Sequence, residues 1–294
     1  MTLHPRLDDG YNRRVLESLD VRVEDYSEKA APALPSVILP SIHLLGIPFH
    51  GLTSDQVLER VTAFIQAGKK SHQICLGNAY TVSLSWKDTE LRRILDRADL
   101  VLADGMSIVW GGRWIGVDLP CRIAGPDFSE SLCGYAEKMG YRVYFLGSTS
   151  DTLIKLKEVL LLKWPGLRIV GMQSPPMCDK LGPDDNNSIF NALHAAKPDI
   201  LFVGMSTPKQ EKWIASNMQS FEVPVCIGIG AAFDFISGRI PRAPLFFQKT
   251  GMEWLYRLYR EPRRLWKRYL LGNFIFLSHL GVAWLRFRLR LLSE

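Results

Sequence analysis

Residues 199–213 read DILFVGMSTPKQEKW, an apolar run that passes through Gly204 into a segment with helix-forming residues. The apolar run predicts a strand over 199–204. Pro208 is favoured at the first position of a helix, because the N–H that it lacks would have no helical partner there. The stretch therefore predicts a strand followed directly by a helix over 208–219.

The same order of strand and helix extends along most of the chain. Further strands are expected at 42–47, 73–76, 99–102, 142–147, 167–171 and 223–229. Further helices are expected at 54–67, 88–97, 126–139, 150–162, 184–196 and 253–260. This alternation predicts an α/β fold with a mainly parallel sheet and flanking helices. Ligands bind such sheets beyond the carboxyl ends of the strands, where the sequence places Asn78, Asp104, Gly147, Gly204 and Gly230.

The basic residues are concentrated at the C-terminal end. Residues 251–268 read GMEWLYRLYREPRRLWKR, and the mostly apolar run YLLGNFIFLSHLGVAWL follows at 269–285. Segment 251–294 carries 9 Lys or Arg and 3 Asp or Glu, which equals the +6 of the whole chain. A cationic, aromatic and apolar segment suits an anionic bilayer surface. We therefore expect a helical, basic amphipathic appendage over 251–294 that associates with membrane.

This segment is open to three other interpretations. A span needs about 20 predominantly apolar residues, and the run 269–285 is shorter and interrupted by Asn273, Ser278 and His279. Interleaved arginines and aromatic residues also suit nucleic acid, but nucleic acid offers nothing for the run 274–277 to bury against. A solvated charge run beside a core helix stays as the alternative. We expect a peripheral membrane protein with no nucleic-acid partner.

The remaining composition points to a cytoplasmic globular protein. The five cysteines are scattered without a CxxC pair, which indicates buried, reduced thiols. No apolar signal core opens the sequence, and residues 1–40 are expected to form a poorly ordered arm before a core over 41–250. The six histidines lie far apart and no DxD follows an apolar strand, so neither a metal site nor another cofactor is expected.

The triplet ADG at 103–105 offers the first candidate for chemistry. Asp104 follows a predicted strand and precedes Gly105 and a helix expected over 106–112. A carboxylate in this place projects into the crevice of the sheet, where it can act as a general base. It can equally cap the following helix, which is a common role for Asp.

Three further segments contain candidate ligand contacts. In GMSTPKQEKW, Gln210 and Glu211 lie in the first turn of a helix whose free N–H groups attract anions. In GIGAAFDFISG, Gly230 and Asp234 suit a loop near a phosphate or a ribose, although the segment is no dinucleotide fingerprint. In CRIAGPDF, Arg122 can hold a phosphate or carboxylate, or can pair with Asp127.

Together these segments resemble the WecG/TagA/CpsF family of bacterial glycosyltransferases. The resemblance covers about residues 43–268. It rests on seven motifs in order, namely DG at 104–105, RIAGPD at 122–127, FLG at 145–147, PKQE at 208–211, GIGAAFD at 228–234, GRIPRAP at 238–244 and GMEWLYRLYREPRR at 251–264. The last of these is nearly diagnostic by itself. The chain departs from the family at Leu76, where some members carry Thr, and at Ser148, where a second glycine is usual.

The resemblance implies a Rossmann-like α/β core and an appendage that helps to complete the site at the membrane. It implies an inverting, metal-independent transfer from a UDP-sugar to a polyprenyl-diphosphate-linked acceptor at the cytoplasmic face of the inner membrane. The sugar expected is N-acetylmannosamine, its uronic acid or glucose. A non-catalytic, membrane-docked nucleotide-binding protein is the alternative, and a homo-oligomer stays open.

The resemblance also implies roles for single residues. Asp104 corresponds to the family's base, which favours catalysis over helix capping. The donor-binding candidates are Asn78, Gly105, Arg122, Gly147, Gly204, Gln210, Glu211, Gly230 and Asp234. Without a metal, the leaving diphosphate needs arginines and helix N-termini. The expected arginines, which also face the membrane, are Arg257, Arg260, Arg263 and Arg264.

Overall fold

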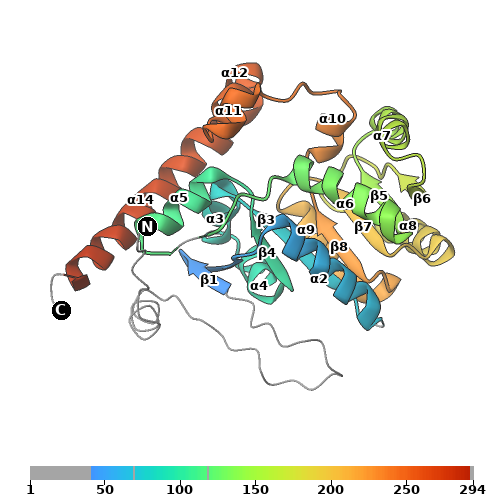
Figure 1. Ribbon diagram of the computed structural model, residues 1–294, viewed down its shortest axis with the longest axis horizontal. Coiled ribbons are helices and arrows are strands. Elements are labelled where there is room, and N and C mark those ends of the chain that lie inside the picture. Colours follow the sequence, from blue (N-terminus) through green and yellow to red (C-terminus); the bar gives the residue numbers. More distant parts are fainter. Residues whose placement is uncertain (1–40, 69, 118, 292–294) are drawn as a thin grey trace, which may run out of the picture.

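A six-stranded parallel sheet forms the centre of the computed structural model, which describes residues 41–68, 70–117 and 119–291 (Figure 1). The strand order is β4-β3-β8-β7-β5-β6, and every neighbouring pair is parallel. The strands are β3 (His72–Gly77), β4 (Leu100–Ala103), β5 (Arg142–Gly147), β6 (Arg168–Gln173), β7 (Ile200–Gly204) and β8 (Val225–Gly228). The predicted arm over 1–40 lies outside the described residues.

Helices cover both faces of this sheet (Figure 1). On one face pack α2 (Ser54–Ala67), α6 (Gly125–Met139) and α7 (Ser150–Lys163), and on the other α8 (Pro183–Ala196) and α9 (Lys209–Phe221). Successive strand residues alternate between the two layers, so that Phe145 joins the first core and its neighbours Tyr144 and Leu146 join the second. The expected α/β, Rossmann-like architecture is therefore confirmed.

The first expected strand, 42–47, is instead an antiparallel hairpin. It consists of β1 (Ser41–Leu44) and β2 (Ile47–His50), with Leu44 paired to Ile47 across a two-residue turn. Leu45 and Gly46 both have positive φ angles, 53° and 84°, which reverse the chain direction. The prediction of one strand was wrong because leucine rarely marks this turn, whereas Asn or Asp before Gly would have signalled it.

Three helices follow the strands that carry the site. They are α3 (Ala79–Ser85), α4 (Thr89–Arg97) and α5 (Met106–Trp114). Helix α3 was not predicted, because its sequence AYTVSLS is short and five of its seven residues are serine, β-branched or aromatic. These helices and the hairpin enclose a third core, which also contains Phe276 and Leu280 of the C-terminal segment.

The C-terminal segment is helical almost throughout. After α10 (Ala232–Ile236) and α11 (Leu245–Lys249) it contains α12 (Glu253–Arg260), α13 (Pro262–Trp266), a π-helical turn η1 (Lys267–Leu271) and α14 (Gly272–Leu291). The stretch Pro262–Leu289 is 28 residues long and contains an 18-residue window with a mean hydropathy of 1.3, so it is long and apolar enough to cross a membrane by length and composition alone. The expectation that the segment is too short for a span is therefore wrong as an argument from length.

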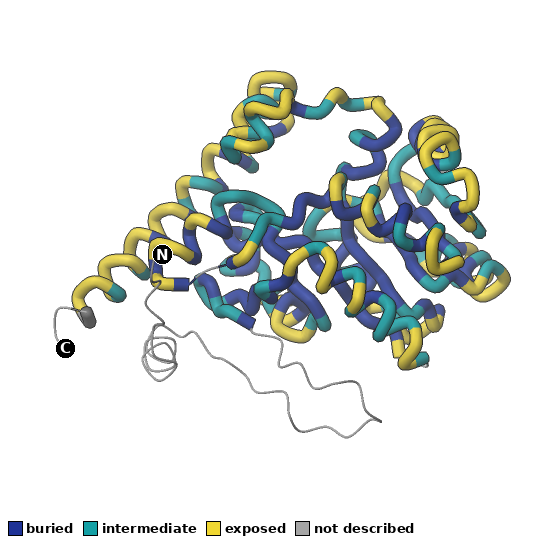
Figure 2. Tube along the Cα trace, viewed as in Figure 1, coloured by how far each residue is buried: buried dark blue, intermediate teal, exposed yellow. Residues whose placement is uncertain are grey.

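Helix α14 packs lengthwise on the core through one side. It lies against α3, where Ser83 Oγ donates a hydrogen bond of 2.7 Å to the carbonyl oxygen of Gly272. His279 stacks on Trp86 at 3.8 Å between ring centroids. Phe276 is only 1% exposed, whereas the outer side of the helix is exposed over most of its length (Figure 2). This packing places the appendage beside the strand ends that hold the candidate site.

Candidate active site

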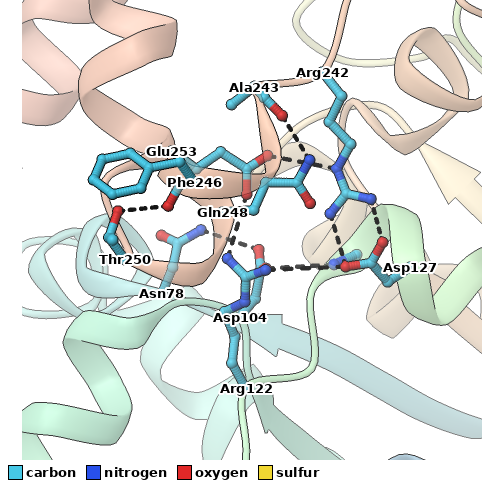
Figure 3. Close-up of polar contacts among 11 residues, drawn as sticks. Asn78, Asp104, Arg122, Asp127, Arg242, Ala243, Phe246, Gln248, Thr250 and Glu253 are labelled. Atoms are coloured by element: carbon cyan, nitrogen blue, oxygen red, sulfur yellow. Dashed lines mark hydrogen bonds and ion pairs between the residues drawn. The ribbon is translucent and has the colours of Figure 1, made fainter.

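Asn78 and Asp104 meet at the carboxyl ends of two neighbouring strands. Asn78 follows β3 and Asp104 follows β4, and the parallel register pairs Gly77 with Ala103. The Asp104 backbone N–H donates to the Gly77 carbonyl at 2.8 Å, which continues the ladder by one residue. Asn78 Nδ2 donates to Asp104 Oδ2 at 3.5 Å (Figure 3). Each residue lies at a strand end, as the sequence indicated, and the pairing of β3 with β4 brings the two side chains together.

Asp104 does not cap the helix that follows it. The residue at the N-cap of α5 is Gly105, and no side chain in the described part of the chain caps that helix. Asp104 Oδ1 instead accepts a hydrogen bond of 3.4 Å from the backbone N–H of Gly125, the first residue of α6. The carboxylate is therefore held by Asn78 on one side and by a helix N-terminus on the other, which leaves the capping interpretation without support.

The pKa of the Asp104 carboxyl group is raised above its ordinary value. Burial is the largest cause, and the negative charge of Glu253 acts in the same direction. The Gly125 N–H, the Arg122 guanidinium and the Asn78 amide act in the opposite direction because they stabilise the carboxylate. A carboxylate with a raised pKa is a stronger proton acceptor, which is the property that a general base needs.

Asn78 has a second task as the N-cap of α3. Its Oδ1 accepts hydrogen bonds from the backbone N–H groups of Tyr80 and Thr81 at 3.1 and 3.2 Å. Because these bonds use the amide oxygen, the amide nitrogen is directed to Asp104. The cap therefore fixes which end of the amide faces the carboxylate.

Arg122 contacts a carboxylate of the appendage. Its Nη1 donates to Glu253 Oε2 of α12 at 3.3 Å, whereas Nη2 lies 3.9 Å from Asp127 Oδ2. Asp127 is bound more closely by Arg242, with 2.7 Å between Arg242 Nη2 and Asp127 Oδ2 (Figure 3). Arg242 Nε also lies 3.7 Å from Glu253 Oε1. Neither Arg242 nor Glu253 was a sequence candidate, although each lies within a motif of the family resemblance.

Gln210 and Glu211 are buried, so neither side chain lies on an open surface. Gln210 Oε1 accepts a hydrogen bond of 2.9 Å from the backbone N–H of Gly230, and its Nε2 donates to Glu211 Oε1 at 2.9 Å. Thr207 Oγ1 also donates to Glu211 Oε1 at 2.9 Å, and burial raises the pKa of Glu211. The pair holds the turn at Gly230 in place behind the strand ends.

The candidate glycines divide into two kinds. At Gly147, with φ of 124°, a Cβ would lie 2.4 Å from the carbonyl oxygen of Gly204, and a Cβ on Gly204 would lie 2.7 Å from the Phe233 ring. These two glycines are required by the packing of the strand ends. Gly230 has φ of 58° with open space where a Cβ would stand, and a Cβ at Gly105 would make only ordinary contacts. Gly230 therefore leaves room for a ligand near its backbone.

Asp234 accepts hydrogen bonds from the loop after β5. Its Oδ1 is 3.3 Å from Ser148 Oγ and 3.4 Å from Thr152 Oγ1, and Arg239 Nη1 lies 3.6 Å away. Ser148 stands where the resembled family usually has a second glycine. Its hydroxyl therefore closes a contact between the loop after β5 and helix α10 that a glycine would not make.

Two of the four appendage arginines line a cavity. The cavity, of about 170 Å³, lies between the segment after α10 and helix α12. Its lining residues are Arg239, Ile240, Pro241, Tyr256, Arg257, Arg260 and Glu261. Arg263 and Arg264 are exposed instead, and Arg264 Nη2 forms an ion pair of 2.7 Å with Glu261 Oε2. The four arginines therefore form two groups, and sequence reasoning did not identify Arg239 as a member of the first.

Within the described residues, no group of three or more His, Cys, Asp or Glu side chains is placed to hold a metal ion. The charged groups near the strand ends are the carboxylate of Asp104, which is the candidate base, and a set in which arginines alternate with carboxylates. That set consists of Arg122, Glu253, Arg242 and Asp127. Such an arrangement can accept a proton at Asp104 and can hold an anion near the arginines.

Comparison with known proteins agrees with this geometry. The Glycosyl transferase WecG/TagA/CpsF family matches residues 42–290. A relative from Bacillus spizizenii, named N-acetylglucosaminyldiphosphoundecaprenol N-acetyl-beta-D-mannosaminyltransferase, is 34% identical over 177 residues, which are 60% of this chain and 66% of that protein. A relative of the same name from Bacillus subtilis is 32% identical over 184 residues, 63% of this chain and 69% of that protein. The chain belongs to the WecG/TagA/CpsF family of glycosyltransferases.

Proposed function

We propose that this chain is an inverting, metal-independent glycosyltransferase that moves a sugar from a UDP-sugar to a polyprenyl-diphosphate-linked saccharide. The observation that carries the proposal is Asp104, a carboxylate of raised pKa held by Asn78 and the N-terminus of α6 at the carboxyl edge of the sheet. The product would serve the biosynthesis of a bacterial surface polysaccharide or exopolysaccharide.

In the proposed reaction, Asp104 takes the proton of an acceptor hydroxyl group while the hydroxyl oxygen attacks the anomeric carbon of the donor. The bond from that carbon to the diphosphate oxygen breaks, and UDP leaves with the bonding electron pair. One displacement inverts the anomeric centre. In this proposal, Arg257 and Arg260 stabilise charge on the diphosphate, and their lining of a cavity together with Arg239 supports that role. Asn78 orients the base in this scheme.

The other candidate residues have supporting roles in the proposal. Arg122 and Asp234, with the backbone at Gly105 and Gly230, contact the donor. Gln210 and Glu211 act through the Gly230 turn, because both side chains are buried behind it. Gly147 and Gly204 allow the strand ends to approach closely enough to form the floor of the site.

The appendage is proposed to dock on an anionic membrane without crossing it, which places the protein at the cytoplasmic face of the inner membrane. A perpendicular span would need to withdraw Phe276 and Leu280 from the core cluster that they share with α3 and α5. The opposite side of α14 exposes Phe274, Leu277 and Leu285, which can enter the interface of a bilayer.

The donor sugar is proposed to be N-acetylmannosamine, its uronic acid or glucose. N-acetylmannosamine has the strongest support, because both relatives are named for its transfer to a diphosphoundecaprenol-linked N-acetylglucosamine. The second candidate function is a membrane-docked nucleotide-binding protein without catalysis. The observation that favours this second function is the group of exposed arginines on the appendage, Arg263 and Arg264, which lie apart from the cavity arginines.

The test is release of UDP from each of the three UDP-sugars, with and without a polyprenyl-diphosphate N-acetylglucosamine acceptor in anionic vesicles. We expect release with one donor that depends on the acceptor and continues in excess EDTA. Nucleotide binding without turnover would establish the second function instead. Loss of turnover in EDTA that Mg²⁺ or Mn²⁺ restores would contradict the metal-independent mechanism.

The arginine assignment has its own test on a short-chain acceptor dissolved in detergent, where membrane docking does not matter. Arg257→Ala should lower turnover by about 10-fold or more if the side chain stabilises the leaving diphosphate. Normal turnover on that acceptor, together with weakened vesicle binding, would reassign Arg257 to docking.

A further inference from the structure

Glu253 is the point at which the appendage contacts the neighbourhood of Asp104. Its carboxylate lies between two guanidinium groups, 3.3 Å from Arg122 Nη1 and 3.7 Å from Arg242 Nε. Asp127 contacts the same two arginines from the other side, which closes a ring of alternating charge (Figure 3). The ring joins the segment before α6, the first turn of α6, the segment after α10 and helix α12.

Within this ring, the pair of Arg122 and Glu253 differs from an ordinary surface ion pair in its burial. The side chains of Arg122 and Glu253 are 16% and 18% exposed. Removing both charges from water is unfavourable unless their geometry is well satisfied, and removal of one partner leaves the other uncompensated. Arg242 Nε is buried, has no hydrogen-bond partner among the described residues and lies 3.7 Å from Glu253 Oε1. Glu253 therefore contacts both arginines, and its closer contact is the one of 3.3 Å with Arg122.

We propose that Glu253 is a positioning residue for the transfer reaction, because it holds Arg122 beside Asp104 and so makes the geometry of the site depend on the seating of α12. The proposal rests on the function proposed for Asp104. Arg242 is the second support of the same carboxylate, and Asp127 holds Arg242 from its exposed side. The conservative alternative is that the ring only fastens the appendage to the core.

The effect of the Glu253 charge on Asp104 distinguishes a positioning role from a fastening role. The groups that face Asp104 are the Asn78 amide, the Gly125 N–H, the Arg122 guanidinium and the Glu253 carboxylate. Of these, Glu253 raises the pKa of Asp104 and the other three lower it. A fastening role would affect thermal stability, whereas a positioning role beside a base must also affect the pH dependence of turnover.

The test compares Glu253→Gln and Glu253→Ala in the full chain with anionic vesicles and a UDP-sugar that supports turnover. A glutamine side chain has the size of glutamate and an oxygen that can accept a hydrogen bond from Arg122, but it lacks the negative charge. Because that charge raises the pKa of Asp104, this pKa should fall in the variant. Because the base must be ionised, the acidic limb of the kcat/KM profile should then move to lower pH. Ala also frees Arg122, and should lower kcat/KM on the plateau by about 10-fold or more.

Glu90→Gln is the matched control. Glu90 also forms a close ion pair, 2.8 Å from its Oε2 to Lys212 Nζ, but it lies on α4 outside the site. This variant should leave both the plateau and the acidic limb unchanged.

The outcomes separate this inference from the proposed function. An acidic limb unmoved in Glu253→Gln, with a lower melting temperature in both Glu253 variants, would show fastening only and overturn the inference. Near-normal turnover of Asp104→Asn would instead overturn the proposed function on which the inference rests. We predict that Glu253→Gln keeps the plateau value of kcat/KM near that of the wild type and moves the acidic limb to lower pH. Glu253→Ala should lower the plateau value.

Discussion

The sheet edge and the C-terminal appendage use charge in opposite ways. At the sheet edge, single charged groups are partly or wholly buried and held by specific partners, as Asp104 is by Asn78 and Gly125. In the appendage, most cations are exposed, and Arg263 stands beside large exposed apolar side chains such as Trp266. Buried charge has a perturbed pKa and a fixed geometry, which suits chemistry, whereas exposed charge suits attraction to a surface.

The difference also divides helix α14 along its length. Phe276 and Leu280 are each 1% exposed and belong to the core, whereas Phe274 on the other side is 72% exposed. The appendage is therefore part of the folded domain through one side and an open surface through the other. Variants that separate stability, membrane binding and turnover can test this division.

The largest effect on stability is expected at Phe276. Phe276→Ala should lower the free energy of unfolding by about 3–5 kcal/mol, because it leaves a cavity in a packed core. Phe274→Ala is the matched control, with a change within about 0.5 kcal/mol, because its side chain is exposed. Denaturant unfolding measures both, and equal losses would erase the distinction between the two sides of α14.

Membrane binding should depend on the exposed side of α14, where Phe274 lies, and not on the buried side that holds Phe276. Phe274→Ser with Leu277→Ser should weaken binding to anionic vesicles by about 10-fold or more, since each side chain loses about 1.5–3 kcal/mol of apolar burial. Thermal stability and turnover on a detergent-soluble acceptor should stay near wild type. Unchanged co-sedimentation with vesicles would show that this side of α14 meets something other than the bilayer.

A smaller, salt-dependent effect is expected at the exposed arginines. Each basic residue near an anionic surface contributes about 1 kcal/mol. Arg263→Glu should weaken vesicle binding more than Arg264→Glu, because Glu261 already offsets part of the Arg264 charge. The loss should shrink as salt rises, because screening weakens the wild-type contact as well. A loss that is independent of salt would contradict surface attraction as its cause.

The smallest effect is a gain in stability at the sheet edge. Because the pKa of Asp104 is raised in the folded protein, ionised Asp104 destabilises the fold at a pH above that value. Asp104→Asn should therefore raise the melting temperature at pH 8 by about 2 °C. The gain should disappear as the pH falls below the unfolded pKa, where wild-type Asp104 is neutral in both states. Calorimetry of wild type and variant at pH 8 and at a pH below the unfolded pKa measures whether the variant has the higher melting temperature at pH 8 only.

Local sequence predicted the parts of the fold that local physics decides. The apolar run at 142–147 and the strand β5 coincide, and the expected helix 253–260 coincides with α12. The hairpin was missed because its turn depends on Leu45 at a positive φ, and α3 because its stability comes from the Asn78 cap and packing against α14. Propensity does not report either of these tertiary contributions.

The candidate site was predictable only in part for the same reason. The sequence placed Asn78 and Asp104 each at a strand end, because alternating strands and helices predict a parallel sheet. That the two residues meet follows from the pairing of β3 with β4, which only the structure shows. The contact between Arg122 and Glu253 joins residues 131 positions apart, and no local pattern reports it. Burial of Glu211 likewise depends on how α9 packs on β3, where Gln73 Nε2 donates to the Glu211 carbonyl at 3.0 Å.

Turnover of Asp104→Asn is the most direct test of the central claim that Asp104 is the base of a glycosyl transfer. Asn keeps the size of the side chain and a hydrogen-bonding group for Gly125 but cannot take a proton. We predict that the variant folds and binds the UDP-sugar as the wild type does, while acceptor-dependent UDP release falls by about 10²-fold or more. Release within a few-fold of wild type, measured in the same vesicles, would contradict the account.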